Sequence, residues 1–453
     1  MSPAHHARRL LRALLASGAL LVLSHASVAA QRETSSAAAT IAHAIRAGDA
    51  SATRALLQHH VELNEPLLDG STLLAWAVES QNSEIVRLLL DHGARASGVG
   101  DVSVAPLFIA CQYGDPTILG ALLDKRADLK ATRADGITPL SVCAGNAPPG
   151  ILERMIAAGA TIDHADEAGQ TPLMWAAARG RVENIKVLVA HGAHVNGKSV
   201  KGFTPLFFSL KSHVPEAPMA LLALGADADY IAPDGTSVVQ LAMYQKDYAF
   251  AEQMIARGAN LNAFDRNGNQ LLHAAVLANQ PSLVRLLLAK GADANALTGT
   301  STIKMRFEVN FKTDDYEVPP KAPLLLAAES GYAQVMQLLV DGGANPQFHT
   351  PDGTNVLLAA AASGKLDALR LALQLVPDPN TATKDGDTPL HILLGTGTGA
   401  ELAPMMKLLA EAGARTDIRN RSGQTAADVA KDAQTDAQLA YENAFGVHRV
   451  GKL

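Results

Sequence analysis

A six-residue pattern that recurs every 33 residues is the feature of this sequence that most restricts its fold. The pattern reads Asp-Gly-Ile-Thr-Pro-Leu at 135–140, Ala-Gly-Gln-Thr-Pro-Leu at 168–173 and Lys-Gly-Phe-Thr-Pro-Leu at 201–206. Steps of 33 residues from these prolines reach further apolar or proline positions, and the interval is longer in only two places: Leu73, Pro106, Val238, Leu271, Pro323, Val356, Pro389 and Ala426. A fixed period of this length indicates stacked repeat units. Such an array also explains how 453 residues fold without one large hydrophobic core.

Each period predicts two helices joined by short turns. Proline suits the first turn of a helix because that position has no hydrogen bond to lose, and the preceding threonine is a good N-cap. Glycine stands 20 residues after the proline position in most units, where it can end the second helix in the left-handed conformation: Gly93, Gly159, Gly192, Gly225, Gly258, Gly291 and Gly343. Arg126 and Val376 replace this glycine, so the helix ends are less certain there.

This arrangement resembles the ankyrin repeat family over about residues 37 to 445. The family's Thr-Pro-Leu-His sequence stands at 388–391, and Leu272-His273-Ala274-Ala275 keeps its second half. The resemblance implies an all-α ankyrin-repeat solenoid with about ten internal repeats between N- and C-terminal caps. It also implies that His273 and His391 hold turns together by hydrogen bonds. A role in binding other proteins, without catalysis, is what the family resemblance leads us to expect.

The predicted organisation follows the repeat register. We expect a signal peptide (1–30), an N-terminal linker with capping helices (31–68), a first block of ankyrin repeats (69–296), a hairpin-like insertion (297–320), a second block of repeats (321–421) and a C-terminal capping repeat with a tail (422–453).

The N-terminus has the composition of a secretory signal peptide. Arg8, Arg9 and Arg12 precede an apolar run from 13 to 23, and small residues lead to a cleavage site after Ala30. The apolar run is much shorter than the roughly 20 residues that span a membrane, which disfavours an anchor. We therefore predict a periplasmic or secreted protein with no membrane span in the mature chain, and both Sec and twin-arginine export remain open.

The two cysteines, Cys111 and Cys143, fall on first helices of neighbouring repeats. In an oxidising compartment they could form a disulfide. Stacked helices lie roughly 8–10 Å apart, farther than the usual Cα separation of a disulfide. Two buried, unbonded thiols are the favoured interpretation.

The insertion interrupts the repeat with a strand-like alternation. Apolar residues alternate with polar ones, a period typical of a β-strand: Ile303, Met305, Phe307, Val309 and Phe311. Asp314-Asp315 predicts a turn, and 316–318 a short return strand. The apolar face could pack on the protein's own repeats, or dock a partner by strand addition. A disordered loop is the third interpretation.

The family resemblance also places candidate binding residues on a concave face. Its ligand-facing positions lie in the turn before the first helix and near that helix's end. In this sequence they are Gln112, Tyr113, Arg179, Lys201, Phe203, Lys211, Tyr244 and Gln245. Tyrosine, phenylalanine and arginine are frequent anchors of protein interfaces.

Other functions have less support in the sequence. A formal net charge of −6 without a basic stripe disfavours nucleic acid as a partner. Trp76 and Trp175 occupy a position predicted to face the core, and we find no motif for a catalytic site, metal or cofactor. We expect a non-catalytic scaffold that binds a protein partner; the alternatives are a secreted effector or toxin acting on another cell, and a glycan-binding solenoid of the cell envelope.

Overall fold

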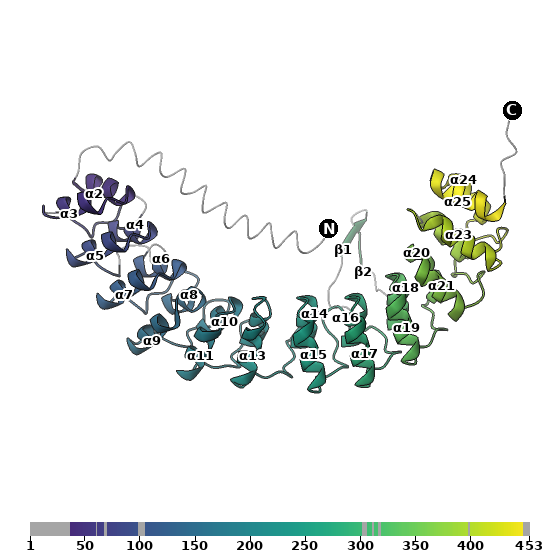
Figure 1. Cartoon of the computed structure of the whole chain (residues 1–453), viewed down its shortest axis with the longest axis horizontal. Coiled ribbons are helices and arrows are strands. Elements are labelled where there is room, and N and C mark those ends of the chain that lie inside the picture. Colours follow the sequence, from purple (N-terminus) through teal and green to yellow (C-terminus); the bar gives the residue numbers. More distant parts are fainter. Residues whose placement is uncertain are drawn as a thin grey trace, which may run out of the picture. The chain divides into compact units, whose positions relative to one another are not determined.

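The computed structural model describes residues 37–59, 61–67, 70–97, 105–300, 306–309, 312–315, 319–396 and 399–446. The chain divides into two compact units, with the boundary between Asp227 and Ala228. Each unit is built from consecutive helix pairs, as the all-α prediction requires. Within each unit the first helices of the pairs lie along one side and the second helices along the other (Figure 1).

Unit 1 contains α2 (Ala37–Arg46), α3 (Ala50–Leu56), α4 (Leu73–Glu79), α5 (Ser83–Asp91), α6 (Pro106–Tyr113), α7 (Pro116–Asp124), α8 (Pro139–Asn146), α9 (Pro149–Ala157), α10 (Pro172–Ala178), α11 (Val182–Ala190), α12 (Pro205–Ser209) and α13 (Glu216–Ala223).

Unit 2 contains α14 (Val238–Tyr244), α15 (Tyr248–Ala256), α16 (Leu271–Leu277), α17 (Pro281–Ala289), the strands β1 (Arg306–Val309) and β2 (Lys312–Asp315), then α18 (Pro323–Glu329), α19 (Ala333–Asp341), α20 (Val356–Ser363), α21 (Leu366–Leu375), α22 (Pro389–Thr396), α23 (Leu402–Glu411), α24 (Ala426–Asp432) and α25 (Thr435–Phe445).

The helices begin and end for the reasons that the sequence suggested. The Thr138 hydroxyl accepts from the Ser141 amide at the start of α8, and Thr171 does the same for Met174 at α10. The seven predicted closing glycines all have φ between 89° and 96°. Arg126 also adopts a positive φ of 57°, whereas the chain passes Val376 with φ −128°. The left-handed ending is therefore retained at Arg126 and lost at Val376.

The core runs between the two helices of each pair and between neighbouring pairs. The leucine after the proline position is fully buried at Leu140, Leu173 and Leu206. The two tryptophans depart from the prediction, because both are only partly buried. Trp175 donates its indole N–H to Asp166 at 3.4 Å, and the Arg46 guanidinium lies 3.8 Å from the Trp76 ring centroid. Their position lies at the edge of the buried face, where a polar group can reach the indole.

Neighbouring repeats are joined by their loops as well as by apolar contacts. The loop before each first helix is here called the finger, and in several fingers a backbone amide donates to a carbonyl of the preceding finger. Examples are Val200 N–H to the Ala168 carbonyl at 2.9 Å and Gly299 N–H to Gly268 at 2.7 Å. Gly169 has φ 73°, and a Cβ there would lie 2.5 Å from the Val200 nitrogen. Glycine is needed at that turn for both its backbone angle and the close approach.

Asparagine side chains form a second connection. Asn196 donates to the Gly225 carbonyl at 3.1 Å and accepts from the Asp227 amide at 2.8 Å. Asn295 makes the same pair of bonds to Gly343 and Asn345, at 3.0 and 2.7 Å, across the insertion. Repeat stacking in unit 2 therefore continues from α16 and α17 to α18 and α19 in spite of the additional residues.

The described part of the insertion is an antiparallel pair of strands, and its register corrects the sequence prediction. Arg306 pairs with Asp315, and Val309 pairs with Lys312. Asp314 and Asp315 therefore lie within β2 and do not form the turn, and the predicted return strand at 316–318 lies outside the described residues. The Asp-Asp pair was the stronger turn signal in the sequence, but pairing β1 directly with the residues that follow it requires only a short connection.

Cys111 and Cys143 form a disulfide, so the prediction of unbonded thiols is wrong. Their Cα atoms are 4.5 Å apart, and both side chains are fully buried between α6 and α8. The prediction used a typical distance between helix axes, but residues on the facing sides of two helices approach more closely than the axes do. Ala110 and Ala144, adjacent to the cysteines, are also buried and add little bulk.

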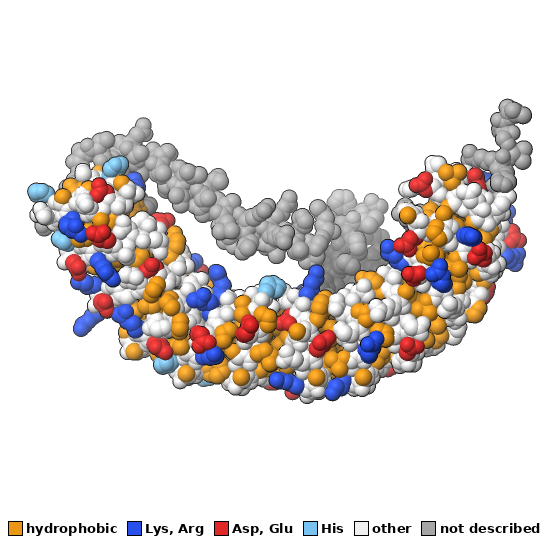
Figure 2. All heavy atoms as spheres, viewed as in Figure 1, with side chains coloured by type: hydrophobic (Ala, Val, Ile, Leu, Met, Phe, Trp, Pro, Cys, Tyr) orange, Lys and Arg blue, Asp and Glu red, His pale blue; other side chains and the backbone are white. Residues whose placement is uncertain are grey.

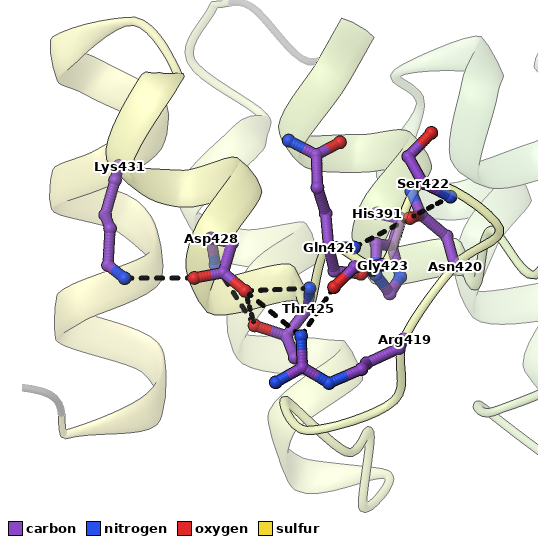
Figure 3. Close-up of polar contacts among 9 residues, drawn as sticks. All are labelled: His391, Arg419, Asn420, Ser422, Gly423, Gln424, Thr425, Asp428 and Lys431. Carbon is purple, nitrogen blue, oxygen red and sulfur yellow. Dashed lines mark hydrogen bonds and ion pairs between the residues drawn. The ribbon is translucent and has the colours of Figure 1, made fainter.

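The C-terminal helix pair begins with a polar cap (Figure 3). Thr425 and Asp428 form a reciprocal capping box at the start of α24, and Lys431 pairs with Asp428 at 3.0 Å. The hydrogen bond from the Thr425 backbone amide is the largest cause that holds the pKa of the Asp428 carboxyl well below its usual range, and the bond from the Lys431 ammonium is the next largest. The Asn420 side chain accepts from the amides of Ser422 and Gln424 in the finger. These bonds satisfy backbone amides at the start of α24 and in the finger before it.

Among the described residues, no helix is both long and apolar enough to cross a bilayer.

Candidate partner-binding surface

Six of the eight predicted concave-face residues lie along the first helices of unit 1. Gln112 and Tyr113 end α6, and Arg179 follows α10 directly as its C-cap. Lys201 and Phe203 belong to the finger before α12, and Lys211 follows that helix closely. We call these six residues and the surface around them the first-helix surface of unit 1. The helices that carry it contact one another in sequence, α6 with α8, α8 with α10, and α10 with α12.

The side chains of this surface are largely exposed. Tyr113 is 53% exposed, and Gln112, Arg179, Lys201 and Lys211 are also exposed, whereas Phe203 is partly buried. Tyrosine and arginine are residue types enriched among interface hot spots. The prediction that these residues bind a partner remains a prediction.

Packing beneath the surface positions its side chains. Arg179 lies over α8, where its Cγ would be 3.1 Å from a Cβ at Gly145, so glycine makes room for the arginine stem. The Lys211 ammonium lies 5.7 Å from the Phe208 ring centroid, within reach of a cation–π interaction. Phe203 stacks against Phe207 with ring centroids 5.5 Å apart. The surface thus combines cations with aromatic rings.

The remaining two predicted residues, Tyr244 and Gln245, lie at the end of α14 in unit 2. The Tyr244 hydroxyl donates to the buried Asp265 carboxylate, and the Asn267 side-chain amide donates to the Tyr244 oxygen at 3.3 Å. The pKa of Tyr244 is raised to about 12, mainly because its hydroxyl is buried and secondly because it donates a hydrogen bond to Asp265. Asp265 and Asn267 were not singled out in the sequence, although the Asp265 position just before the Asn-Gly turn could have indicated them.

The two histidines of the Thr-Pro-Leu-His position are structural, as the resemblance implied. His273 donates through Nε2 to the Ala296 carbonyl at 3.0 Å and accepts at Nδ1 from the Gln270 amide at 3.3 Å. His391 bonds the Gln424 carbonyl at 3.1 Å in the same way (Figure 3). Burial lowers the pKa of His273. Each ring therefore connects its own helix start to the next finger, which leaves it unsuited to binding a ligand.

The predicted binding residues of the insertion fall mostly outside the described residues. Ile303, Met305 and Phe311 are not described, and Phe307 and Val309 are placed only by their backbone in β1.

A groove on the second-helix side of unit 1 is lined by charged residues of α5, α7 and α9. Lys125 pairs with Asp91 at 3.0 Å, and Arg154 with Asp124 at 2.7 Å. Each pair joins two successive repeats, which explains the charges without a ligand. Figure 2 shows charged and hydrophobic side chains interspersed over the visible face. Among the described residues, no group of three or more His, Cys, Asp or Glu side chains is arranged to hold a metal ion.

Comparison with known proteins agrees with this architecture. A family model described as "Ankyrin repeats (3 copies)" matches residues 10–99, 107–199, 140–230, 213–298 and 324–420. The chain belongs to the ankyrin repeat family. Ankyrin repeats generally mediate protein–protein interaction and generally act as scaffolds without enzymatic activity.

Curated relatives share part of the repeat array. Ankyrin repeat domain-containing protein 63 of Homo sapiens is 33% identical over 98 residues, which cover 22% of this chain and 26% of the relative. Ankyrin repeat and SOCS box protein 16 of Mus musculus is 32% identical over 123 residues, covering 25% of this chain and 26% of the relative. The matched region thus spans about a quarter of the length of these relatives.

Proposed function

We propose that this ankyrin repeat protein is exported and binds a protein partner through the first-helix surface of unit 1, without catalysing a reaction. The observation that carries the proposal is the set of exposed tyrosine, arginine and lysine side chains at the ends of the first helices α6, α10 and α12 and in the finger before α12. Their exposure leaves them available to a partner, while the residues beneath them are packed in the core.

Two observations support export. The sequence begins with basic residues, a short apolar run and small residues before Gln31. The buried disulfide between Cys111 and Cys143 is the kind of cross-link that persists in oxidising compartments such as the periplasm and the cell exterior.

Native purification tests the binding proposal. The full chain, expressed with its own N-terminus and a C-terminal tag, is purified from the periplasm and from the medium, and co-eluting proteins are identified. The dissociation constant of the purified partner is then measured for the wild type and for a Gln112→Ala, Tyr113→Ala variant. Loss of a tyrosine anchor should weaken binding at least tenfold, or about 1.4 kcal/mol.

Leu439→Ala is the matched control, because Leu439 is 51% exposed on α25 of unit 2 and is not one of the residues of this surface. The control should bind as the wild type does. A partner that binds the Gln112→Ala, Tyr113→Ala variant with unchanged affinity would show that this surface is not the binding site. Recovery of the unprocessed chain from the cytoplasm alone would refute export.

The insertion provides a second proposed contact with the partner. We propose that its apolar residues add to the partner contact, since β1 and β2 form a two-stranded ribbon with two edges that another strand can join. Phe307→Ala with Phe311→Ala should then weaken partner retention at unchanged thermal stability. Unchanged retention with a lower unfolding temperature would instead assign these residues to packing on the protein's own repeats.

A further inference from the structure

The charge of the first-helix surface differs from that of the whole chain. The chain carries a formal net charge of −6, but residues 198–213 contain three lysines and no aspartate or glutamate. This segment comprises the finger before α12, the helix itself and the residues that follow it. Arg179 at the end of α10 adds another cation from the preceding repeat.

Three of these cations have no carboxylate partner among the residues that the structure describes. Arg179, Lys201 and Lys211 are exposed, and no aspartate or glutamate forms an ion pair with them. On the second-helix side of the same unit, by contrast, Lys125 and Arg154 each pair with an acid of the preceding repeat. Charge pairing between repeats is therefore available to this scaffold, but Arg179, Lys201 and Lys211 take no part in it among the described residues.

Helix stability explains the positions of only two of these three cations. Arg179 and Lys211 follow the C-termini of α10 and α12, where a cation interacts favourably with the helix dipole. Lys201 lies in a finger, before the start of α12, so the dipole gives no reason for a cation there. Neighbouring repeats are roughly 10 Å apart, close to the screening length at physiological salt, so like charges on them still repel weakly.

Two acidic residues of the finger before α10 form no ion pair with these cations. Asp166 is buried and accepts hydrogen bonds from the Trp175 indole and from amides of its own finger. Glu167 is exposed on the same finger and forms no ion pair with Arg179, Lys201 or Lys211. The exposed cations therefore remain available for an anionic ligand, and the partly exposed rings of Phe203 and Phe208 supply apolar contact beside them.

We propose that Arg179, Lys201 and Lys211 bind an acidic segment of the partner protein, in which carboxylates alternate with aliphatic residues. The inference rests on the proposed function and specifies the chemistry of the partner. Carboxylates pair with the three cations, while aliphatic side chains contact Phe203 and Phe208. Three cations on a chain of net negative charge suit a short acidic peptide better than a nucleic acid, whose binding needs a more extended basic surface.

Fluorescence anisotropy with a defined probe tests this inference. The probe is a labelled 14-residue peptide of alternating glutamate and leucine or alanine, and a second peptide carries glutamine in place of glutamate. The wild-type full chain should bind the glutamate peptide at least tenfold more tightly than the glutamine peptide. Its affinity should fall severalfold between 50 and 300 mM NaCl because exposed charge pairs are screened.

Charge reversal locates the site. Lys201→Glu with Lys211→Glu should weaken binding of the glutamate peptide at least tenfold, since repulsion replaces attraction at two positions. Lys186→Glu is the matched control: Lys186 is exposed on α11, the second helix of the adjacent repeat, and pairs with Glu183. This variant should bind as the wild type does. Circular dichroism and the unfolding temperature verify that each variant is folded.

Several results would overturn the inference. One is that the wild type binds the glutamate and glutamine peptides equally, or binds neither. Another is that the charge-reversal variant binds the glutamate peptide as tightly as the wild type does. A third is that a 14-nucleotide oligothymidine binds the wild type more tightly than the glutamate peptide and displaces it. The proposed function is refuted by a different result, namely a co-purified partner that binds the Gln112→Ala, Tyr113→Ala variant as tightly as the wild type. A partner that depends on Tyr113 but not on Lys201 and Lys211 would support the function and refute the acidic segment.

Discussion

The first helices of the two units use the same 33-residue module but stabilise its contacts differently. In unit 1, α6 and α8 are joined by the Cys111–Cys143 disulfide, and the exposed side of the stack carries cations. In unit 2, the buried face of α16 holds His273, which bonds the Ala296 carbonyl, and Tyr244 bonds the buried Asp265. Unit 1 has a covalent link in addition to polar contacts such as that of Trp175 with Asp166, whereas unit 2 contains no cysteine. The module therefore fixes where residues are buried and leaves open which chemistry joins them.

Reduction of the disulfide should give the largest difference between the units. The bond closes a loop with a sequence separation of 32 residues, and its loss should lower the free energy of unfolding of unit 1 by about 3–4 kcal/mol. Unit 2 contains no cysteine and should not respond. Hydrogen exchange with and without a phosphine reductant measures both units in one sample. A Cys111→Ala, Cys143→Ala variant should be insensitive to reductant, and equal losses in both units would contradict the comparison.

Acid should instead weaken unit 2 at His273. Burial lowers the pKa of this imidazole, so the folded state favours its neutral form. The stabilisation is complete above the unfolded pKa of about 6.5 and is lost as the pH falls towards the folded pKa. His273→Gln removes this titration but disturbs two hydrogen bonds, at a cost of about 2 kcal/mol at neutral pH.

The measurement is hydrogen exchange of α16 and the finger after α17 between pH 7.5 and 5, corrected for intrinsic exchange rates. The exposed His43 in unit 1 supplies a control, His43→Gln, that should leave the pH response of unit 2 unchanged. If the His273→Gln variant retained the full wild-type pH dependence of unit 2, His273 would not be its source.

Tyr244→Phe should have a smaller effect on unit 2. It removes one hydrogen bond to Asp265, whose carboxylate still accepts from the Asn267 and Asn269 amides, so the loss should be about 1 kcal/mol. Ultraviolet titration gives a separate readout, because the pKa of Tyr244 is raised to about 12. Since this pKa exceeds the unfolded value, the stabilisation is present below about pH 10 and is lost as the pH rises towards 12. Burial also raises the pKa of Tyr441, so the variant should have one late-ionising tyrosine fewer than the wild type, and an unchanged number would contradict the assignment.

Arg126→Gly should change stability least and in the opposite direction. Arg126 has φ 57° at a position where glycine stands in most units, and glycine removes the cost of the left-handed conformation. Greater entropy of the unfolded chain offsets part of this gain, leaving about 0.5 kcal/mol in favour of unit 1. Chemical denaturation measures the shift. Val376→Gly serves as the comparison, because φ −128° gives glycine no such advantage there, and this variant should be destabilised.

The helix starts and the family could be predicted from the sequence because they depend on local residue preferences that recur in every repeat. Proline marks the first residue of α6, α8, α10, α12, α18 and α22, and the glycine positions predicted the left-handed endings. The six surface residues of unit 1 were accessible for a related reason, since the register places equivalent positions on the same side of every first helix. Their role in binding is still a prediction.

Contacts between repeats were decided only by the tertiary structure. The period can be read from the sequence, but the 4.5 Å distance between the Cα atoms of Cys111 and Cys143 cannot, because it depends on which sides of α6 and α8 face each other. It could not show that Asp314 and Asp315 lie in a strand, because pairing depends on both strands together. It also could not assign Asp265 to Tyr244, a contact between residues 21 positions apart. Local propensity and period determine the repeated module, whereas the distances between side chains on neighbouring modules exist only once the modules are stacked.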